Sequence, residues 1–235
     1  MYDAPRVIVF DVNETLSDMT ALSTRFTDVG VPAHVAQLWF SSVLREGFAL
    51  TAVDASQPFA TIGREVLRDL LDETTLNRSM DEAVEHILSA FTGLPVHPDV
   101  VEGVHALREA GLRLVTLSNG AAHVAENLLD AAGIRGEFEH VLSVEDAGAW
   151  KPDRRAYEYA ARVCDTELAR MMMVAVHPWD IDGAARAGMS TAWVNRTGRH
   201  YPSYAAPPTV TVTVLSRLPD MLAARGGDCE PDSDL

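Results

Sequence analysis

The pattern of apolar and polar positions divides the chain into three zones. Residues Arg6–Phe10 are dense in β-branched and aromatic side chains, which predicts a buried strand. From about Ser17 to Leu94, apolar residues recur at spacings of three and four, the period of an amphipathic helix. After Leu94, short apolar runs alternate with helical segments as far as Val214. Such alternation predicts a parallel sheet with right-handed helical crossovers.

The middle zone predicts helices over 33–53, 61–71 and 81–91. Ser79 followed by Glu82 has the spacing of a capping box, which marks the start of the third of these helices. The whole zone is expected to form a helical unit of about four helices, inserted directly after the first strand.

The last zone supplies the rest of the sheet. The expected strands are 112–117, 140–144, 171–176, 191–195 and 210–214, and the expected helices are 121–132, 153–163, 181–187 and 215–224. The ending, 225–235, is polar and acidic and predicts a flexible tail.

Composition sets limits on partners and location. The chain has 235 residues, 47% of them hydrophobic, which is enough for a full core and a small second unit. Its net charge of −15 opposes nucleic acid and anionic membrane surfaces as partners. The two cysteines form no disulfide framework. Neither a signal peptide nor a membrane span is expected, so a cytoplasmic protein is the expectation.

Polar residues follow several of the predicted strands. Asp11 comes after the first strand, Ser118 and Asn119 after the second, and Asp180 after the strand 171–176. Parallel sheets place ligand chemistry at the carboxyl ends of their strands. A lone aspartate in this position is more often a turn former, so the interpretation rests on the whole set.

Lys151 is the only lysine of the chain. A compact ammonium beside a carboxylate keeps that carboxylate ionised and aimed, as a carboxylate nucleophile requires. A single lysine is ordinarily solvated, but its uniqueness and its place before Pro152, at the predicted start of a helix, favour the site.

The motifs FDVNETL, LSNG, WKPDRRAYEYA and HPWDIDGAARAG, in this order, resemble the haloacid dehalogenase (HAD) superfamily and, within it, the type II or L-2-haloacid dehalogenase branch. The resemblance covers about Val7 to Arg196. It implies an α/β fold with a HAD-like Rossmannoid core, built on a parallel sheet and formed by 1–16 and 95–224. It also implies an inserted helical cap over 17–94.

The resemblance implies hydrolysis of a carbon–halide bond in a small organic acid. Asp11 would attack the carbon that bears the halogen, and water would hydrolyse the aspartyl ester to give a 2-hydroxy acid. Thr15 and Lys151 would orient Asp11, and Asp180 would orient Lys151 and the water. Further roles in binding the substrate or leaving group are implied for Ser118, Asn119, Tyr157, Trp179, Val12 and Asn13.

Six of these residues can also be interpreted as purely structural. Small polar side chains cap helices and turns, and aromatic side chains fill cores. These alternatives apply to Thr15, Ser118, Asn119 and Asp180 as caps, and to Tyr157 and Trp179 as packing residues.

Two positions oppose a magnesium-dependent phosphatase, the main alternative within the superfamily. Such phosphatases usually carry a second aspartate where this chain has Asn13, and an acidic residue where it has Val176. A hard cation needs clustered oxygen ligands, and phosphoryl transfer without it leaves negative charge uncompensated. No metal or other cofactor is therefore expected, and Mg²⁺ belongs only to the phosphatase alternative. A catalytically silent binding protein is disfavoured by the intact set of motifs.

The chain departs from the branch pattern in the cap and after one strand. Phe40 stands where the branch has an arginine that binds halide and substrate carboxylate, and Arg45 is a weak substitute because of its angle on the helix. His177 replaces an asparagine. Histidine side chains in general can act as bases near neutral pH, so His177 is interpreted either as the base for the hydrolytic water or as a structural donor. The sequence leaves open whether the chain forms a homodimer.

Overall fold

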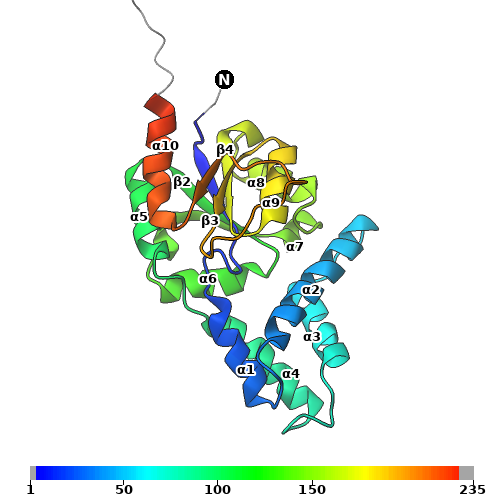
Figure 1. Cartoon of the computed structure of the whole chain (residues 1–235). Helices are drawn as coiled ribbons and strands as arrows, with labels where there is room; N and C mark the ends of the chain where they lie inside the picture. Colours follow the sequence, from blue (N-terminus) through cyan, green and yellow to red (C-terminus); the bar gives the residue numbers. More distant parts are fainter. Residues whose placement is uncertain (1–3, 228–235) are drawn as a thin grey trace, which may run out of the picture.

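A computed structural model of the chain describes residues 4–227. Its centre is a six-stranded sheet of order β3-β2-β1-β4-β5-β6, in which every pair of neighbours is parallel (Figure 1). The strands are β1 (Val7–Phe10), β2 (Arg113–Ser118), β3 (Phe138–Ser143), β4 (Met171–Ala175), β5 (Ser190–Val194) and β6 (Val210–Val212). The predicted α/β fold with a parallel sheet is confirmed.

Helices cover both faces of the sheet, and the strand residues alternate between two buried clusters. Val7 and Val9 face α8 and α9, whereas Ile8 and Phe10 face α5, α6 and α10. All four residues of β1 are fully buried, as expected for a central parallel strand. The helices are α5 (Val100–Glu109), α6 (Ala122–Ala131), α7 (Val144–Ala147), α8 (Arg154–Val163), α9 (Pro178–Ala187) and α10 (Leu218–Gly227). Within residues 4–227, no helix is long and apolar enough to cross a bilayer.

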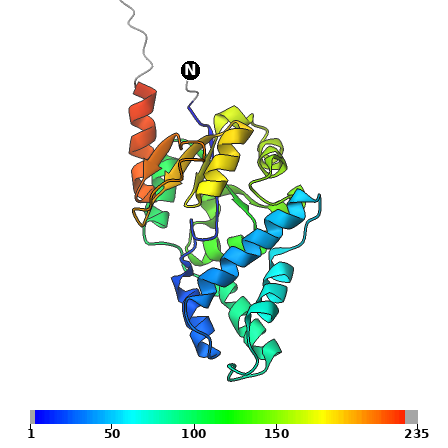
Figure 2. The same ribbon diagram turned by 45° about the vertical axis from the view of Figure 1, so that its right-hand side comes forward.

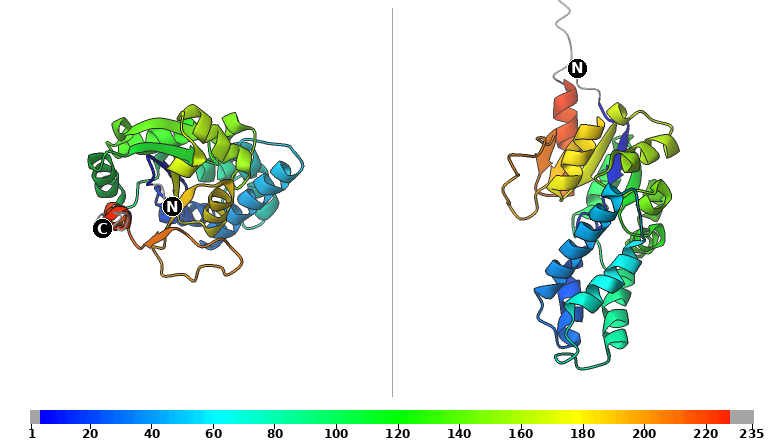
Figure 3. Two further views of the ribbon diagram at one scale, coloured as in Figure 1. Left: turned by 90° about the horizontal axis from the view of Figure 1, so that it is seen from above. Right: turned by 90° about the vertical axis from the view of Figure 1, so that its right-hand side faces the viewer.

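Four further helices lie between β1 and β2 and extend from one end of the sheet (Figures 2 and 3). They are α1 (Leu22–Asp28), α2 (Val35–Ala52), α3 (Phe59–Leu70) and α4 (Met80–Leu88). The predicted capping box of α4 is present. The sequence predicts no range for α1, because this short helix buries only Leu22 and Phe26 and so has no clear apolar period.

The chain enters and leaves this helical insertion side by side. Ser17 and Val96 form an isolated antiparallel bridge, and the Asp18 amide donates to the Pro95 carbonyl at 2.8 Å. The division into a core of 1–16 and 95–224 and a cap of 17–94 stays a prediction.

Several element boundaries differ from the predicted ones. Strand β3 begins at Phe138 rather than 140, because the Phe138 ring packs edge-on against Phe10 at 5.8 Å. Helix α10 continues to Gly227 and so includes 225–227, the first three residues of the predicted tail. The rest of the predicted tail, 228–235, lies outside the described residues.

Trp150 contacts the helical insertion and directly precedes Lys151 in the chain. Its indole Nε1 donates to the Gln57 carbonyl at 3.1 Å, and its backbone amide donates to Thr51 Oγ1 at 3.1 Å. The ring stacks on Phe59 of α3, with centroids 6.0 Å apart, and lies directly against Gly47 of α2. The residue that precedes Lys151 is therefore held in place by hydrogen bonds and ring contacts from the helical insertion.

We expect Gly47→Ala to destabilise this contact, because a Cβ at residue 47 would overlap the Trp150 ring. Overpacking of a buried site costs about 1–3 kcal/mol, which a urea titration measures as a lower free energy of unfolding. The matched control is Gly136→Ala, since no atom lies within 4 Å of a Cβ at that position. Equal stability of the two variants would contradict the proposed close fit.

Candidate active site

The predicted polar residues meet at the carboxyl ends of β1, β2 and β4, the edge of the sheet that faces the insertion. Asp11 follows β1, Ser118 ends β2, and Asp180 lies in the first turn of α9, just after β4. Lys151 lies three residues before the start of α8. The parallel register brings these segments together although they lie far apart in the chain.

Lys151 lies between two carboxylates and is fully buried. Its Nζ donates to Asp11 Oδ1 at 3.0 Å and to Asp180 Oδ2 at 2.6 Å. Burial lowers the pKa of Lys151, but the two carboxylates outweigh it, so the pKa is raised above its ordinary value of 10.5. Lys151 is therefore charged at neutral pH, and the interpretation of a solvated surface lysine is wrong.

Thr15 holds the other oxygen of Asp11. Its Oγ1 donates to Asp11 Oδ2 at 2.7 Å and accepts from the Val176 amide at 3.1 Å. Because the hydroxyl has a backbone donor behind it, its own proton points to Asp11. The Asp11 side chain, which is only 5% exposed, is thus fixed through both oxygens.

Tyr157 holds Asp180 from the side opposite Lys151. The buried phenol donates to Asp180 Oδ1 at 2.7 Å. Burial raises the pKa of Asp180, and Lys151 opposes this rise only in part. Burial, then the Asp180 charge, raises the pKa of Tyr157 well above its ordinary value. Asp180 is not the cap of α9, because the N-cap residue is His177.

Asn119 and Ser118 are buried and bonded to backbone. Asn119 pairs with the backbone of Lys151: its Nδ2 donates to the carbonyl at 3.2 Å, and its Oδ1 accepts from the amide at 3.0 Å. Ser118 Oγ accepts from the Gly120 amide at 2.9 Å. Neither residue caps α6, whose N-cap is Ala121. The structure thus places Asn119 where it positions the Lys151 backbone.

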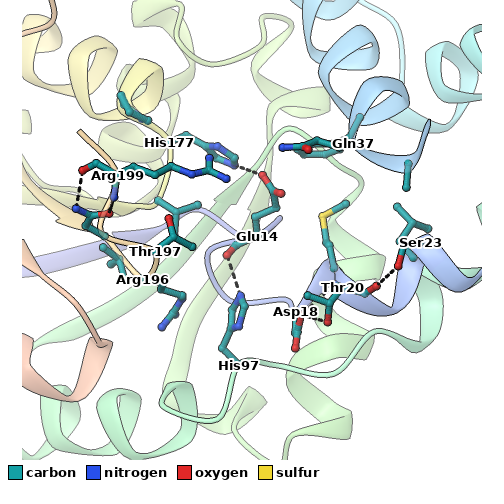
Figure 4. A pocket seen from close by; sticks show the side chains of 18 of the residues that line it. Glu14, Asp18, Thr20, Ser23, Gln37, His97, His177, Arg196, Thr197 and Arg199 are labelled. Carbon is teal, nitrogen blue, oxygen red and sulfur yellow. Dashed lines mark hydrogen bonds and ion pairs between the residues drawn. The ribbon is translucent and has the colours of Figure 1, made fainter. Parts of the chain in front are cut away.

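His177 lies beside Asp11 on the side away from Lys151. Its Nε2 is 3.6 Å from Asp11 Oδ2 and 3.6 Å from Glu14 Oε2. The imidazole stacks on Trp179, with centroids 5.0 Å apart, and lies near the Phe40 ring at 6.3 Å. His177 thus lies between the Asp11 and Glu14 carboxylates, and Figure 4 shows its contact with Glu14.

Sequence reasoning missed Glu14. Its backbone has φ 61°, in the left-handed region that residues other than glycine rarely adopt. Its carbonyl is 3.0 Å from His97 Nε2. The signal available in the sequence was its place in the motif FDVNETL, but nothing there indicated that His177 lies opposite it.

The remaining predicted residues lie around this group. Asn13 is buried, and its carbonyl oxygen is 3.2 Å from His177 Nε2. Val12 is 2% exposed and packs in the core cluster with Phe10, away from the cavity lining. The side chain of Arg45 is 69% exposed and pairs with Glu46 at 2.8 Å, so it does not replace the missing cap arginine.

A cavity of about 610 Å³ opens beyond His177. Glu14, Phe40 and His177 form its wall toward the buried residues Asp11 and Lys151, which do not line it. Its other walls come from 18–23 and 33–37, and from the ends of β4 and β5 with the loop that follows β5 (Figure 4). This cavity is therefore adjacent to the nucleophile candidate Asp11, with His177 between them.

The residues present do not fit a magnesium site. The ammonium of Lys151 lies between the two carboxylates, where a cation would have to lie, and Val176 offers no side-chain oxygen. Within residues 4–227, no three His, Cys, Asp or Glu side chains group in a way that could hold a metal ion. The magnesium alternative is not supported.

Comparisons with known proteins agree with this geometry. Haloacetate dehalogenase H-2 of Moraxella sp. (strain B) is 34% identical over 57% of this chain and 59% of its own. (S)-2-haloacid dehalogenase H-109 of Pseudomonas putida is 29% identical over 92% of this chain and 96% of its own. A dehalogenase crystallised with an intermediate complex superposes with a TM-score of 0.86 at 28% identity, over 95% of this chain and 99% of its own.

A family model described as haloacid dehalogenase-like hydrolase matches residues 5–188, which include all the residues of the buried charge group. The chain therefore belongs to the haloacid dehalogenase-like hydrolase family.

Proposed function

We propose that this chain is a 2-haloacid dehalogenase of the (S)-2-haloacid type. The observation that carries the proposal is the Asp11 carboxylate, held by Lys151 and Thr15 and shielded from solvent, next to a cavity. The relatives are named for haloacetate and for (S)-2-haloacids, which sets the class of substrate.

In the first step, a carboxylate oxygen of Asp11 attacks C2 of the haloacid. The C–O bond forms as the carbon–halide bond breaks, and the halide leaves with the bonding electron pair. Desolvation strengthens the nucleophile, and Lys151 and Thr15 restrict its rotation. Trp179, Phe40 and His177 form an aromatic wall, which keeps water away until the ester has formed.

In the second step, water attacks the Asp11 carbonyl carbon of the ester. The buried Asp180 carboxylate, held by Lys151 next to Asp11, takes a proton from this water. His177 Nε2 lies 3.2 Å from the Asn13 carbonyl, which can only accept, so this nitrogen carries a proton and faces the Asp11 and Glu14 carboxylates, each 3.6 Å away, as a donor. The bond between the Asp11 carbonyl carbon and the substrate oxygen then breaks, and the departing oxygen takes the proton from Asp180. Asp11 loses its remaining proton, so the carboxylate is restored and a 2-hydroxy acid is released.

Lys151 stays charged through both steps. It offsets the negative charge that develops on the Asp11 oxygens when water adds to the ester. Asp180, held by Tyr157, keeps the ammonium in place.

The test of the function is halide release from chloro-, bromo- and fluoroacetate and from 2-chloropropionate. We expect Asp11→Asn to abolish release, since an amide is a far weaker nucleophile, while Asp130→Asn on α6 changes nothing. During turnover in water labelled with heavy oxygen, the Asp11 carboxylate should acquire the label. Label that enters the product alone would rule out the ester.

Turnover should survive a strong chelator. Lys151 supplies the cation of the site, so EDTA should leave the rate of halide release unchanged and added Mg²⁺ should not raise it. Loss of halide release with EDTA that is restored by Mg²⁺ would contradict a metal-free mechanism.

Tyr157→Phe should move the acid limb of the kcat/KM profile to higher pH. The phenol favours ionised Asp180 by donating to it, so its removal raises further a pKa that burial already raises. Tyr159→Phe, on the same helix, is the matched control. A lower kcat with an unmoved acid limb would indicate that Tyr157 contacts the substrate instead.

A further inference from the structure

Arg196 joins three segments of the chain at the edge of the sheet that carries Asp11. It follows the end of β5 and lines the cavity (Figure 4), and its side chain is only 16% exposed. Its Nη1 pairs with Asp99 Oδ2 at 2.5 Å, and its Nη2 donates to the Thr15 carbonyl at 2.9 Å. Because the guanidinium is a planar fork, it holds both acceptors in a fixed geometry.

The ion pair with Asp99 anchors this fork to the core. Burial raises the pKa of Asp99, but the bonds from Arg196 and from the Leu215 amide outweigh burial, so the pKa lies below its ordinary value of 3.8. Asp99 is therefore ionised at neutral pH. It directly precedes α5, a helix that packs on the sheet. The guanidinium is thus attached to a fixed part of the molecule.

The other end of the fork leads to the nucleophile. Thr15 is 1% exposed, and its hydroxyl donates to Asp11 Oδ2 at 2.7 Å and accepts from the Val176 amide at 3.1 Å. Its neighbour Glu14 has φ 61°, an unfavourable backbone conformation that persists only where the surroundings hold it. If the buried Thr15 carbonyl lost its donor, the peptide group would turn toward another one, and the hydroxyl would move with it.

We propose that Arg196 is a positioning residue of the reaction, which fixes the Thr15 carbonyl and so keeps the Thr15 hydroxyl on the Asp11 carboxylate. This inference rests on the proposed function for the identity of the reaction. Arg196 acts through Thr15 and needs no contact with the substrate. Lys151 holds one oxygen of Asp11, and the path from Asp99 through Arg196 and Thr15 holds the other.

The first test separates the aim of the nucleophile from the binding of the substrate. Arg196→Gln should lower kcat for halide release from 2-chloropropionate roughly ten- to 100-fold with KM little changed, because a misplaced reacting group costs rate rather than affinity. Arg196→Lys should recover part of the loss, since an ammonium can still donate to the Thr15 carbonyl. A loss confined to KM would show that Arg196 contacts the substrate and would overturn the inference.

The matched control is Arg113→Gln. Arg113 also bonds a carboxylate and a backbone carbonyl, those of Glu139 at 2.7 Å and Cys164 at 2.8 Å. It lies at the start of β2, at the opposite edge of the sheet from Asp11. Arg113→Gln should therefore lower the free energy of unfolding without lowering kcat. An equal loss of kcat in the two glutamine variants would assign the effect to stability alone.

A double variant tests whether the ion pair matters for its own sake. Arg196→Gln leaves the Asp99 charge unmatched, whereas Arg196→Gln with Asp99→Asn removes both charges. The double variant should unfold at a higher urea concentration than Arg196→Gln and should keep the same low kcat. It also provides a folded protein if the single variant is too unstable to assay. Recovery of kcat in the double variant would overturn the inference.

Coupling to Thr15 distinguishes this path from any other. In Thr15→Val, which has no hydroxyl to position, Arg196→Gln should lower kcat by less than about two-fold further, because the path to Asp11 is already broken. The full loss from Arg196→Gln in this background would show that Arg196 acts independently of Thr15, against the inference.

The last measurement needs no turnover. The Val176 amide donates to Thr15 Oγ1, so its hydrogen exchange, relative to that of the β4 amides, reports whether the hydroxyl stays in place. Exchange should be about ten-fold faster in Arg196→Gln and unchanged in Arg113→Gln. This response, in a protein that releases no halide from any haloacid, would reject the dehalogenase and retain the positioning role. Halide release with kcat and Val176 exchange both independent of Arg196 would reject the positioning role and retain the dehalogenase.

Discussion

The charge group formed by Lys151, Asp11 and Asp180 is the interaction on which the rest of the site depends. Breaking a buried pair typically costs about 3–5 kcal/mol, because a desolvated charge is left unmatched. Since the pKa of Lys151 is raised above 10.5, the stability it provides is complete below that pH and is lost as the pH rises through the folded-state pKa. The Lys151 ammonium therefore contributes both to the stability of the fold and to the ionised state of the Asp11 carboxylate.

The helical insertion supports this charge group indirectly, through its contacts with Trp150. The indole is held by residues of the insertion, and the next residue is Lys151. Asn119 fixes the same backbone from the side of β2. The ammonium therefore reaches Asp11 from a segment that contacts both the helical insertion and the residues that follow β2.

The sequence was enough to predict the parallel sheet, because apolar runs and helical periods alternate clearly. It also indicated Asp11, Lys151 and Asp180, since each follows a strand or precedes a helix. It did not indicate that Tyr157 bonds Asp180 or that Glu14 approaches His177, because those contacts join distant residues in space.

The isolated β-bridge between Ser17 and Val96 brings the two ends of the helical insertion together. Such a unit can be exchanged as a whole, because a short turn between the two points would leave the order of all six strands unchanged. A replacement has to cover Trp150, but it is free to present new walls to the cavity. The walls of the cavity can therefore change by substitution of the insertion while Asp11 and Lys151 stay where they are.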